Sequence, residues 1–186
     1  FFLEDFRETA LESDWAYGTT KAALVLDSVG VEITGTNNAT YGFKQITNSY
    51  GITGAHYAIP FYSYSTTSDT SYDNYWLITP TIYLEPTKQA HLTWDMALTG
   101  SSISTPNNDV VAEANMADDF TFMVAISEDG GKTWKSENAK VWNNTLPSGQ
   151  QLRDIPHDAA NYQIDLSAFE GKNIKHMELS LNVIPE

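Results

Sequence analysis

Apolar residues recur at every second position in three stretches of the chain, and this alternation constrains the fold more than any other feature. The three stretches are residues 90–98, 120–126 and 175–183. A period of two is typical of a β-strand that buries one face and leaves the other in solvent. Shorter candidate strands are residues 22–26, 75–79, 140–142 and 162–166. Helical periodicity is almost absent, and its best case is a short turn at residues 111–117.

Polar turns separate these segments and predict how the strands are joined. Asp129-Gly130-Gly131 predicts a hairpin, because glycine accepts the positive φ that tight turns require. Loops rich in Ser, Thr and Asn are expected at residues 34–40, 63–74 and 101–108. Short strands at this spacing are typical of a sandwich. We therefore expect one all-β sandwich domain over residues 1–186. Its predicted core contains Trp94, Phe122, Val124 and Leu179.

Charge and cysteine content exclude several classes of function. The chain has 10 Lys plus Arg against 24 Asp plus Glu, a formal net charge of −14. Recognition of a phosphate backbone needs clustered Lys and Arg, so we expect no nucleic-acid partner. The absence of cysteine excludes disulfides, thiolate catalysis and Cys-zinc sites. No apolar run approaches the roughly 20 residues of a membrane span, so we expect no membrane insertion.

The sharpest local motif is the Asp-box pattern S-x-D-x-G-x-T-W, which residues 127–134 match at every defined position. In such a box the Asp accepts hydrogen bonds from turn amides, Gly makes the bend and Trp packs back on the strand. Sialidase propellers carry several boxes, but a six-bladed propeller needs roughly 240 residues at about 40 per blade. This chain has one box and only two arginines, Arg7 and Arg153, to bind a substrate carboxylate. We therefore interpret the box as a structural hairpin.

Other catalytic motifs are missing from the sequence. The four histidines show no H-E-x-x-H spacing, and there is no G-x-S-x-G elbow, P-loop or G-x-G-x-x-G. Carboxylate pairs such as Asp118 with Asp119, or Asp95 with Glu178, could serve a glycosidase. An acidic chain contains many such pairs by chance. We expect that the protein is not an enzyme, with a glycosidase as the less favoured alternative.

Tyrosines crowd one stretch between residues 41 and 75, interleaved with Ser, Thr, Asn and Gly. Tyrosine on a polar loop offers a large, stiff contact surface with a hydroxyl at its tip, which suits sugars and protein partners alike. The predicted ligand-binding residues are Tyr62, Tyr64 and Tyr72. The alternative for any single tyrosine is that it caps the core at the end of a strand.

Five segments, taken in order, resemble one family of secreted domains. Residues 2–6 precede Trp15 as in the pattern F-E-x-F followed by a tryptophan, and residues 73–80 resemble D-N-Y-L-x-T-P. Residues 91–94 resemble the next core strand, and residues 122–134 the strand that ends in the Asp box. Residues 162–182 resemble a late D-L-S-x-Y-x-G-K segment. Together they resemble the cleaved-adhesin family, also described as choice-of-anchor J domains, of Bacteroidetes secreted and surface proteins.

The resemblance implies a β-jelly roll similar to MAM and galactose-binding domains, with structural Ca²⁺ on its loops. The family's first calcium ligand corresponds to Glu4, with Asp5 beside it. Its partner Asp lies on a closing strand, and this chain stops at residues 183–186 before such a strand. One carboxylate alone cannot hold an ion that takes six to eight oxygens. Asp69 and Asp73 mark a second candidate calcium site, for which an ordinary polar turn is the alternative.

The resemblance also implies export to the cell surface or the extracellular space. We therefore expect an adhesion or binding module of a larger exported protein, with a host glycoprotein or polysaccharide as its partner. The alternative is a carbohydrate-binding accessory domain of a glycan-degrading system. Both alternatives share one fold, so the fold alone cannot separate them.

Overall fold

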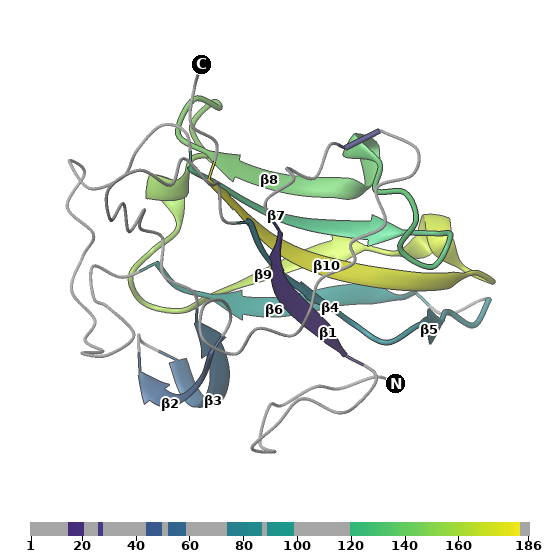
Figure 1. Ribbon diagram of the computed structural model, residues 1–186, viewed down its shortest axis with the longest axis horizontal. Coiled ribbons are helices and arrows are strands. Elements are labelled where there is room, and N and C mark those ends of the chain that lie inside the picture. Colours follow the sequence, from purple (N-terminus) through teal and green to yellow (C-terminus); the bar gives the residue numbers. More distant parts are fainter. Residues whose placement is uncertain are drawn as a thin grey trace.

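The computed structural model describes residues 15–20, 26–27, 44–49, 52–58, 74–86, 89–98 and 120–182. Within these residues the protein is almost entirely antiparallel β-structure (Figure 1). The strands are β1 (Ala16–Thr20), β2 (Lys44–Ser49), β3 (Ile52–Ala58), β4 (Asn74–Ile78), β5 (Ile82–Tyr83), β6 (His91–Met96), β7 (Phe120–Ser127), β8 (Ala139–Asn143), β9 (Ala160–Asp165) and β10 (Asn173–Asn182). Three short 3₁₀ turns are η2 (Ser136–Asn138), η3 (Leu152–Asp154) and η4 (Ser167–Phe169). The predicted all-β class is confirmed.

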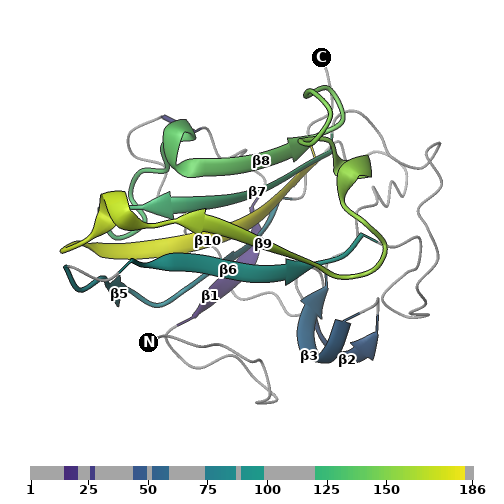
Figure 2. The ribbon, with the colours of Figure 1, turned by 180° about the vertical axis from the view of Figure 1, so that it is seen from behind.

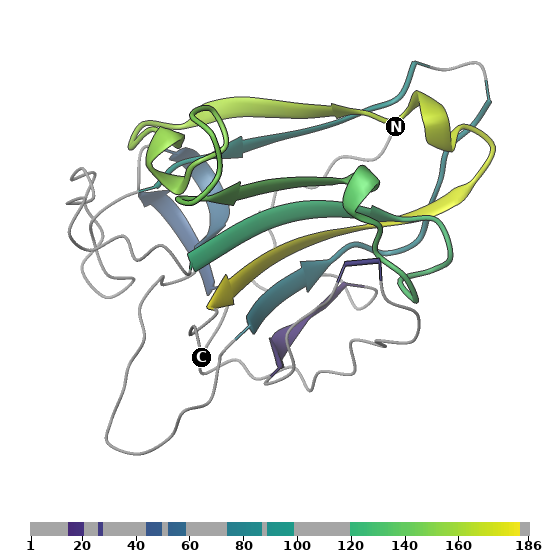
Figure 3. The ribbon, with the colours of Figure 1, turned by 90° about the horizontal axis from the view of Figure 1, so that it is seen from above.

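The described strands form three antiparallel sheets. The largest has six strands in the order β1-β4-β10-β7-β8, with β5 paired to the start of β10. Two further sheets have two strands each, β2 with β3 and β6 with β9. In Figures 2 and 3 the β6–β9 pair forms a separate layer that lies over one face of the large sheet. The strands predicted at residues 90–98, 120–126, 140–142 and 162–166 are present as β6, β7, β8 and β9.

An aromatic and aliphatic core joins the two layers. Its buried residues on β7 and β8 of the large sheet, on η3 and directly after η3 are Phe120, Phe122, Val124, Trp142, Leu152 and Ile155. The facing residues of the β6–β9 pair and its flank are Leu92, Trp94, Met96, Leu98, Tyr162 and Ile164. A smaller cluster around Ile126, Leu166 and Ile174 extends this core toward β5. We call this covered side of the large sheet its inner face.

The opposite side of the large sheet carries a second core. There Trp76, Met123 and Trp134 are buried together, at 1%, 3% and 1% exposure, with Leu26 packed against them. All eight residues of β7 are buried. The alternation of β7 is therefore as predicted, but the expectation of a single buried face is wrong. A strand inside a sheet that is covered on both sides has no solvent face.

The register of β10 gives the backbone position of Leu179, whose side chain is not among those that the structure describes. Leu179 pairs with Met123 of β7 and Trp76 of β4. Its place in the core predicted with Trp94 stays a prediction. On the same strand His176 pairs with Ile126 and is buried on the inner face. The period of two did not show that this polar residue of β10 lies inside.

Burial on both sides of β7 predicts that large-to-small changes on either face are costly. We expect Met123→Ala and Ile126→Ala each to lower the free energy of unfolding by about 2–5 kcal/mol, because each leaves a cavity in a packed core. The exposed Gln163→Ala should stay within about 0.5 kcal/mol of the parent protein. Urea unfolding followed by tryptophan fluorescence measures all three. If Met123→Ala were as harmless as Gln163→Ala, the second core would be wrong.

Candidate functional site

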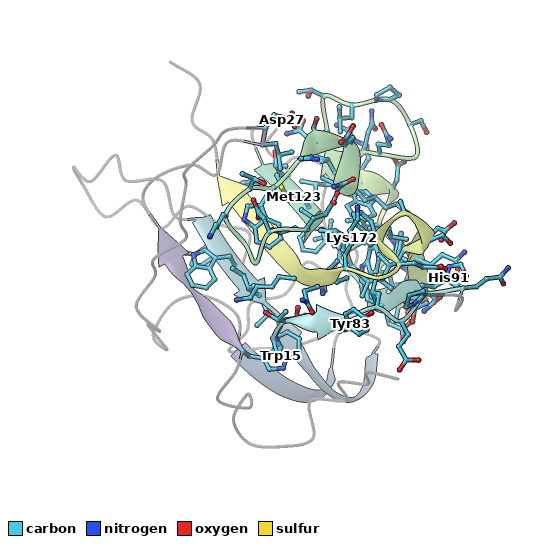
Figure 4. The ribbon with its side chains drawn as sticks, turned by 90° about the vertical axis from the view of Figure 1, so that its right-hand side faces the viewer. Trp15, Asp27, Tyr83, His91, Met123 and Lys172 are labelled. Atoms are coloured by element: carbon cyan, nitrogen blue, oxygen red, sulfur yellow. The ribbon has the colours of Figure 1, made fainter. Side chains whose placement is uncertain are left out.

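The β6–β9 pair separates its side chains cleanly between two faces. Apolar residues point toward the large sheet, and the residues between them are exposed. The exposed set consists of His91, Thr93, Asp95, Asn161, Gln163 and Asp165. We call these six residues the outer polar face. It is the side of the layer turned toward the viewer in Figure 2, and His91 lies at the outer margin of the molecule in Figure 4.

Antiparallel register arranges the outer polar face in three rows. His91 lies opposite Asp165, Thr93 opposite Gln163 and Asp95 opposite Asn161. Directly opposed residues on one face of an antiparallel pair lie close enough to interact. The third row does so, because the Asn161 side-chain amide donates to the Asp95 carboxylate at 2.9 Å. Every row thus combines groups that donate and accept hydrogen bonds on a flat, accessible surface.

One end of the outer polar face is fixed by the turn that follows β9. The hydroxyl of Ser167 donates to the Asp165 carboxylate at 2.5 Å, and the Ser167 backbone N–H donates to the same oxygen at 2.8 Å. These two bonds hold the pKa of Asp165 below its ordinary value, with a smaller contribution from the nearby His91. Asp165 therefore presents an ionised carboxylate in a defined orientation at neutral pH.

Aromatic packing on the inner side holds this layer in place. Trp94 and Tyr162 stack with ring centroids 5.8 Å apart, and Trp142 of β8 meets both of them edge-on. The Lys140 ammonium lies over all three rings, 5.3 Å from the centroids of Trp142 and Tyr162 and 6.0 Å from that of Trp94. Such cation–π contacts add to the burial of the rings. The outer polar face therefore rests on a layer that is anchored to the large sheet.

The Asp box forms the connection between β7 and β8, as the motif predicts. The Asp129 carboxylate accepts the backbone N–H groups of Lys132 and Thr133 at 3.0 and 2.9 Å, and the Thr133 hydroxyl at 2.7 Å. The Ser127 hydroxyl also donates to it at 2.8 Å. Gly130 and Gly131 adopt positive φ values of 78° and 92°, which side chains disfavour. The interpretation of residues 127–134 as a structural hairpin is confirmed.

The carboxylate of Asp129 is occupied by the turn itself. Burial alone would raise the pKa of Asp129, but the hydrogen bonds from Thr133, Ser127 and Lys132 outweigh it and lower the pKa to about 2. Beside the box, the Lys172 ammonium donates to Glu128 at 2.6 Å and ties the turn to the segment before β10. These carboxylates stabilise the fold, and their oxygens are already used by protein donors.

The two members of the carboxylate pair Asp95 and Glu178 come from different sheets. Asp95 is exposed on the outer polar face, whereas the register places Glu178 opposite Val124 and Leu77 in the large sheet. The two residues therefore belong to different layers. The other pair considered, Asp118 with Asp119, lies outside the described residues.

His176 is a buried titratable residue on the inner face. Burial lowers the pKa of His176 to about 4, so its ring is neutral at pH 7. Its backbone N–H donates to the Thr79 hydroxyl at 3.0 Å, and the Thr79 N–H donates to its carbonyl at 2.9 Å. These bonds align β10 with the residue that follows β4.

The predicted metal and ligand residues lie outside the part of the chain that the structure describes. They are Glu4, Asp5, Asp69 and Asp73 for calcium, and Tyr62, Tyr64 and Tyr72 for the ligand. Both sets stay predictions. Among the described residues no group of three or more His, Asp or Glu side chains is arranged to hold a metal ion. No helix in the same part of the chain is long and apolar enough to cross a membrane.

Sequence reasoning identified the alternation of residues 90–98 but did not select its polar residues as a site. The available signal was that His91, Thr93 and Asp95 alternate with the apolar residues of the same strand. The pairing of β6 with β9 joins residues 66 positions apart, as Asn161 and Asp95 show. No local sequence pattern predicts a pairing between residues so far apart in the sequence.

The low pKa of Asp129 makes a pH-dependent contribution to stability. The folded pKa of about 2 lies below the ordinary value of 3.8, so the contribution is present above pH 4 and is lost as the pH falls toward 2. We expect Asp129→Asn to lower the free energy of unfolding by about 1–2 kcal/mol at pH 7, after allowance for solvent screening. The difference from the parent protein should shrink steadily between pH 4 and pH 2.

Chemical unfolding at a series of pH values measures that difference. Asp158→Asn is the matched control, because it removes one exposed carboxylate from the turn before β9. It should change the free energy of unfolding by less than about 0.5 kcal/mol at every pH. A difference for Asp129→Asn that persists unchanged at pH 2 would show that the charge of the Asp box does not stabilise the turn.

Comparison with known proteins identifies no relative of this chain. Family models, curated proteins and solved structures gave no match. The resemblance to the cleaved-adhesin family therefore rests on the five sequence segments alone and stays a prediction. The outer polar face, with the aromatic packing beneath it, is the candidate site among the described residues.

Proposed function

We propose that this chain is a non-catalytic, extracellular binding module of a larger exported protein, and that it binds a glycan or glycoprotein through the outer polar face. The observation that carries the proposal is the composition of this face. Six exposed polar side chains stand in three rows on a layer anchored by Trp94, Trp142 and Tyr162. Groups held on a rigid surface lose little conformational freedom when a ligand binds, which favours recognition.

A jelly-roll sandwich is the architecture that we propose for the complete domain. Two antiparallel layers packed face to face through an apolar core support it, as do the motifs shared with the cleaved-adhesin family. Export to the cell surface or beyond is part of the same proposal. The acidic composition, at a net charge of −14, suits a soluble module that does not bind nucleic acid.

A carbohydrate-binding accessory domain is the second candidate function. The row formed by Asp95 and Asn161 favours it, because the Asn161 amide donates to the Asp95 carboxylate at 2.9 Å and to the Trp94 carbonyl at 3.4 Å, which holds the acceptor oxygens of both side chains next to each other. Adjacent hydroxyl groups of a sugar each donate and accept, so they can pair with both partners of this row. Structural calcium on the loops that carry Asp69 and Asp73 stays part of the proposal in either case.

A binding screen against polysaccharides and host glycoproteins, run with millimolar calcium and again with chelator, tests the function. We expect saturable binding to at least one of these ligands. Thr93→Ala combined with Gln163→Ala should then weaken binding by roughly 5- to 150-fold. This range corresponds to two lost hydrogen bonds at about 0.5–1.5 kcal/mol each.

Ser148→Ala combined with Gln150→Ala is the matched control. It removes the same two kinds of exposed polar group from the loop between β8 and η3, away from the outer polar face. This control should bind like the parent protein. Equal loss in both double variants would move the site away from the outer polar face, and the absence of any ligand in the screen would overturn the binding function itself.

A further inference from the structure

The charges of the outer polar face are all of one sign apart from a histidine. Asp95 and Asp165 supply two carboxylates, and none of the six residues is a lysine or arginine. The Ser167 hydroxyl and N–H hold the pKa of Asp165 below its ordinary value, so this carboxylate stays ionised in any neutral medium. A ligand on this face therefore meets a carboxylate in the first row, at Asp165, and another in the third row, at Asp95.

Two nearby lysines do not neutralise this charge. Lys140 lies among the rings of Trp94, Trp142 and Tyr162, which are on the inner side of the layer. Lys172 is engaged with Glu128 at 2.6 Å. The rest of the protein reinforces the same sign, because the net charge of the whole chain is −14. An anionic ligand would be repelled both at long range and at contact.

The hydrogen-bonding groups of the face suit uncharged partners. Asp95 and Asn161 present acceptor oxygens to a ligand, because the Asn161 amide nitrogen already donates to Asp95 and to the Trp94 carbonyl. Thr93 with Gln163 adds both donors and acceptors in the next row. Successive outward residues on a strand lie roughly 6.7 Å apart, so the three rows present polar groups over about 13 Å. That length accommodates a short run of a polysaccharide with several adjacent hydroxyl groups.

Stacking on an aromatic ring is not the basis of recognition on this face. Among the described residues the exposed large hydrophobic side chain is Tyr83, at 56%. Tyr83 belongs to β5 and pairs with Asn173 of the large sheet, so it is not part of the outer polar face. Hydrogen bonds to hydroxyl groups are the interaction that the face can offer.

We infer that the outer polar face selects a neutral carbohydrate with adjacent hydroxyl groups and rejects sialylated, sulfated and uronic-acid glycans. The inference rests on the proposed binding function and specifies its ligand class. Neutral hydroxyl groups match the rows without placing an anion beside Asp95 or Asp165. An acidic sugar leaves its charge uncompensated on this surface, which costs affinity.

The test compares neutral polysaccharides (β-glucan, mannan and galactan) with acidic ones (polygalacturonate, heparin and polysialic acid), by isothermal titration at low salt in the presence of chelator. The expected result is binding of at least one neutral polysaccharide, with every acidic one at least about tenfold weaker. A second series with millimolar calcium distinguishes direct binding from bridging of an acidic sugar by the cation. If acidic glycans bind only in the presence of calcium, the cation bridges them to the protein, and the inferred preference of the face itself for neutral glycans stands.

Asp95→Asn isolates the role of charge, because it keeps a side-chain oxygen and an amide at the same place. We expect it to reduce the ratio of neutral to acidic affinity by at least about fivefold, because the loss of the charged acceptor lowers neutral affinity while the loss of the negative charge raises acidic affinity. Glu137→Gln is the matched control, since it removes one exposed charge from η2 and not from the face. It should leave the preference for neutral over acidic glycans unchanged.

The outcomes separate this inference from the proposed function. Tight binding of an acidic glycan with chelator present overturns the inference and leaves the binding function standing. Binding to a host glycoprotein that survives complete deglycosylation does the same, because the ligand is then a protein. The absence of any ligand among polysaccharides and glycoproteins overturns the proposed function and the inference together.

Discussion

Burial of β7 on both of its faces is the constraint on which the rest of the structure depends. Val124 and Ala125 are adjacent in sequence, point to opposite sides and are both 0% exposed. Each side of the large sheet must therefore be covered by other parts of the chain. On the inner face the cover is the β6–β9 pair, and on the other face it includes Trp134 of the Asp box. The outer polar face exists because the β6–β9 pair is packed against the large sheet on one side and exposed to solvent on the other.

The packing of Trp134 on the second side of the large sheet explains why the Asp box contains so many hydrogen bonds. Trp134 can enter the core beside Trp76 and Met123 only if the residues before it turn sharply, and the Asp129 bonds fix that turn. The segment after this turn also binds Asp27. The backbone N–H of Ser136 donates to the Asp27 carboxylate at 2.9 Å, although the two residues are 109 positions apart. Asp27 has a φ of 64°, in the region that aspartate tolerates better than most residues. Its N–H donates to the Trp134 carbonyl at 2.9 Å, so one turn orders a distant segment.

Features that depend on residues close in sequence were predicted correctly, whereas features that depend on pairing between distant residues were not. Local patterns predicted β6, β7, β8 and β9, and the Asp box predicted the hairpin between β7 and β8 down to the role of Trp134. The pattern did not show that His176 of β10 is buried, because the two faces of a central strand cannot be told apart in sequence until its neighbours are known. It gave no sign of β2 and β3, whose residues mix Thr, Ser and Gly with few apolar positions. The candidate site was missed for a related reason: its rows join two strands that are distant in sequence.

The outer polar face differs from an ordinary solvated strand surface in how its groups are held. A lysine or glutamate on such a surface keeps its rotamer freedom and must lose it to bind a ligand. Asp95, Asn161 and Asp165 have already lost much of that freedom to one another and to Ser167, through bonds of 2.5–2.9 Å. The stacked rings of Trp94 and Tyr162, on the inner side of the layer, hold β6 and β9 in place. In the proposed binding function, a ligand that matches this arrangement meets a small entropic cost, and the fixed carboxylates disfavour an anionic ligand. Rigidity and charge then act together, because a fixed surface selects for its ligand's charge more strongly than a mobile one does.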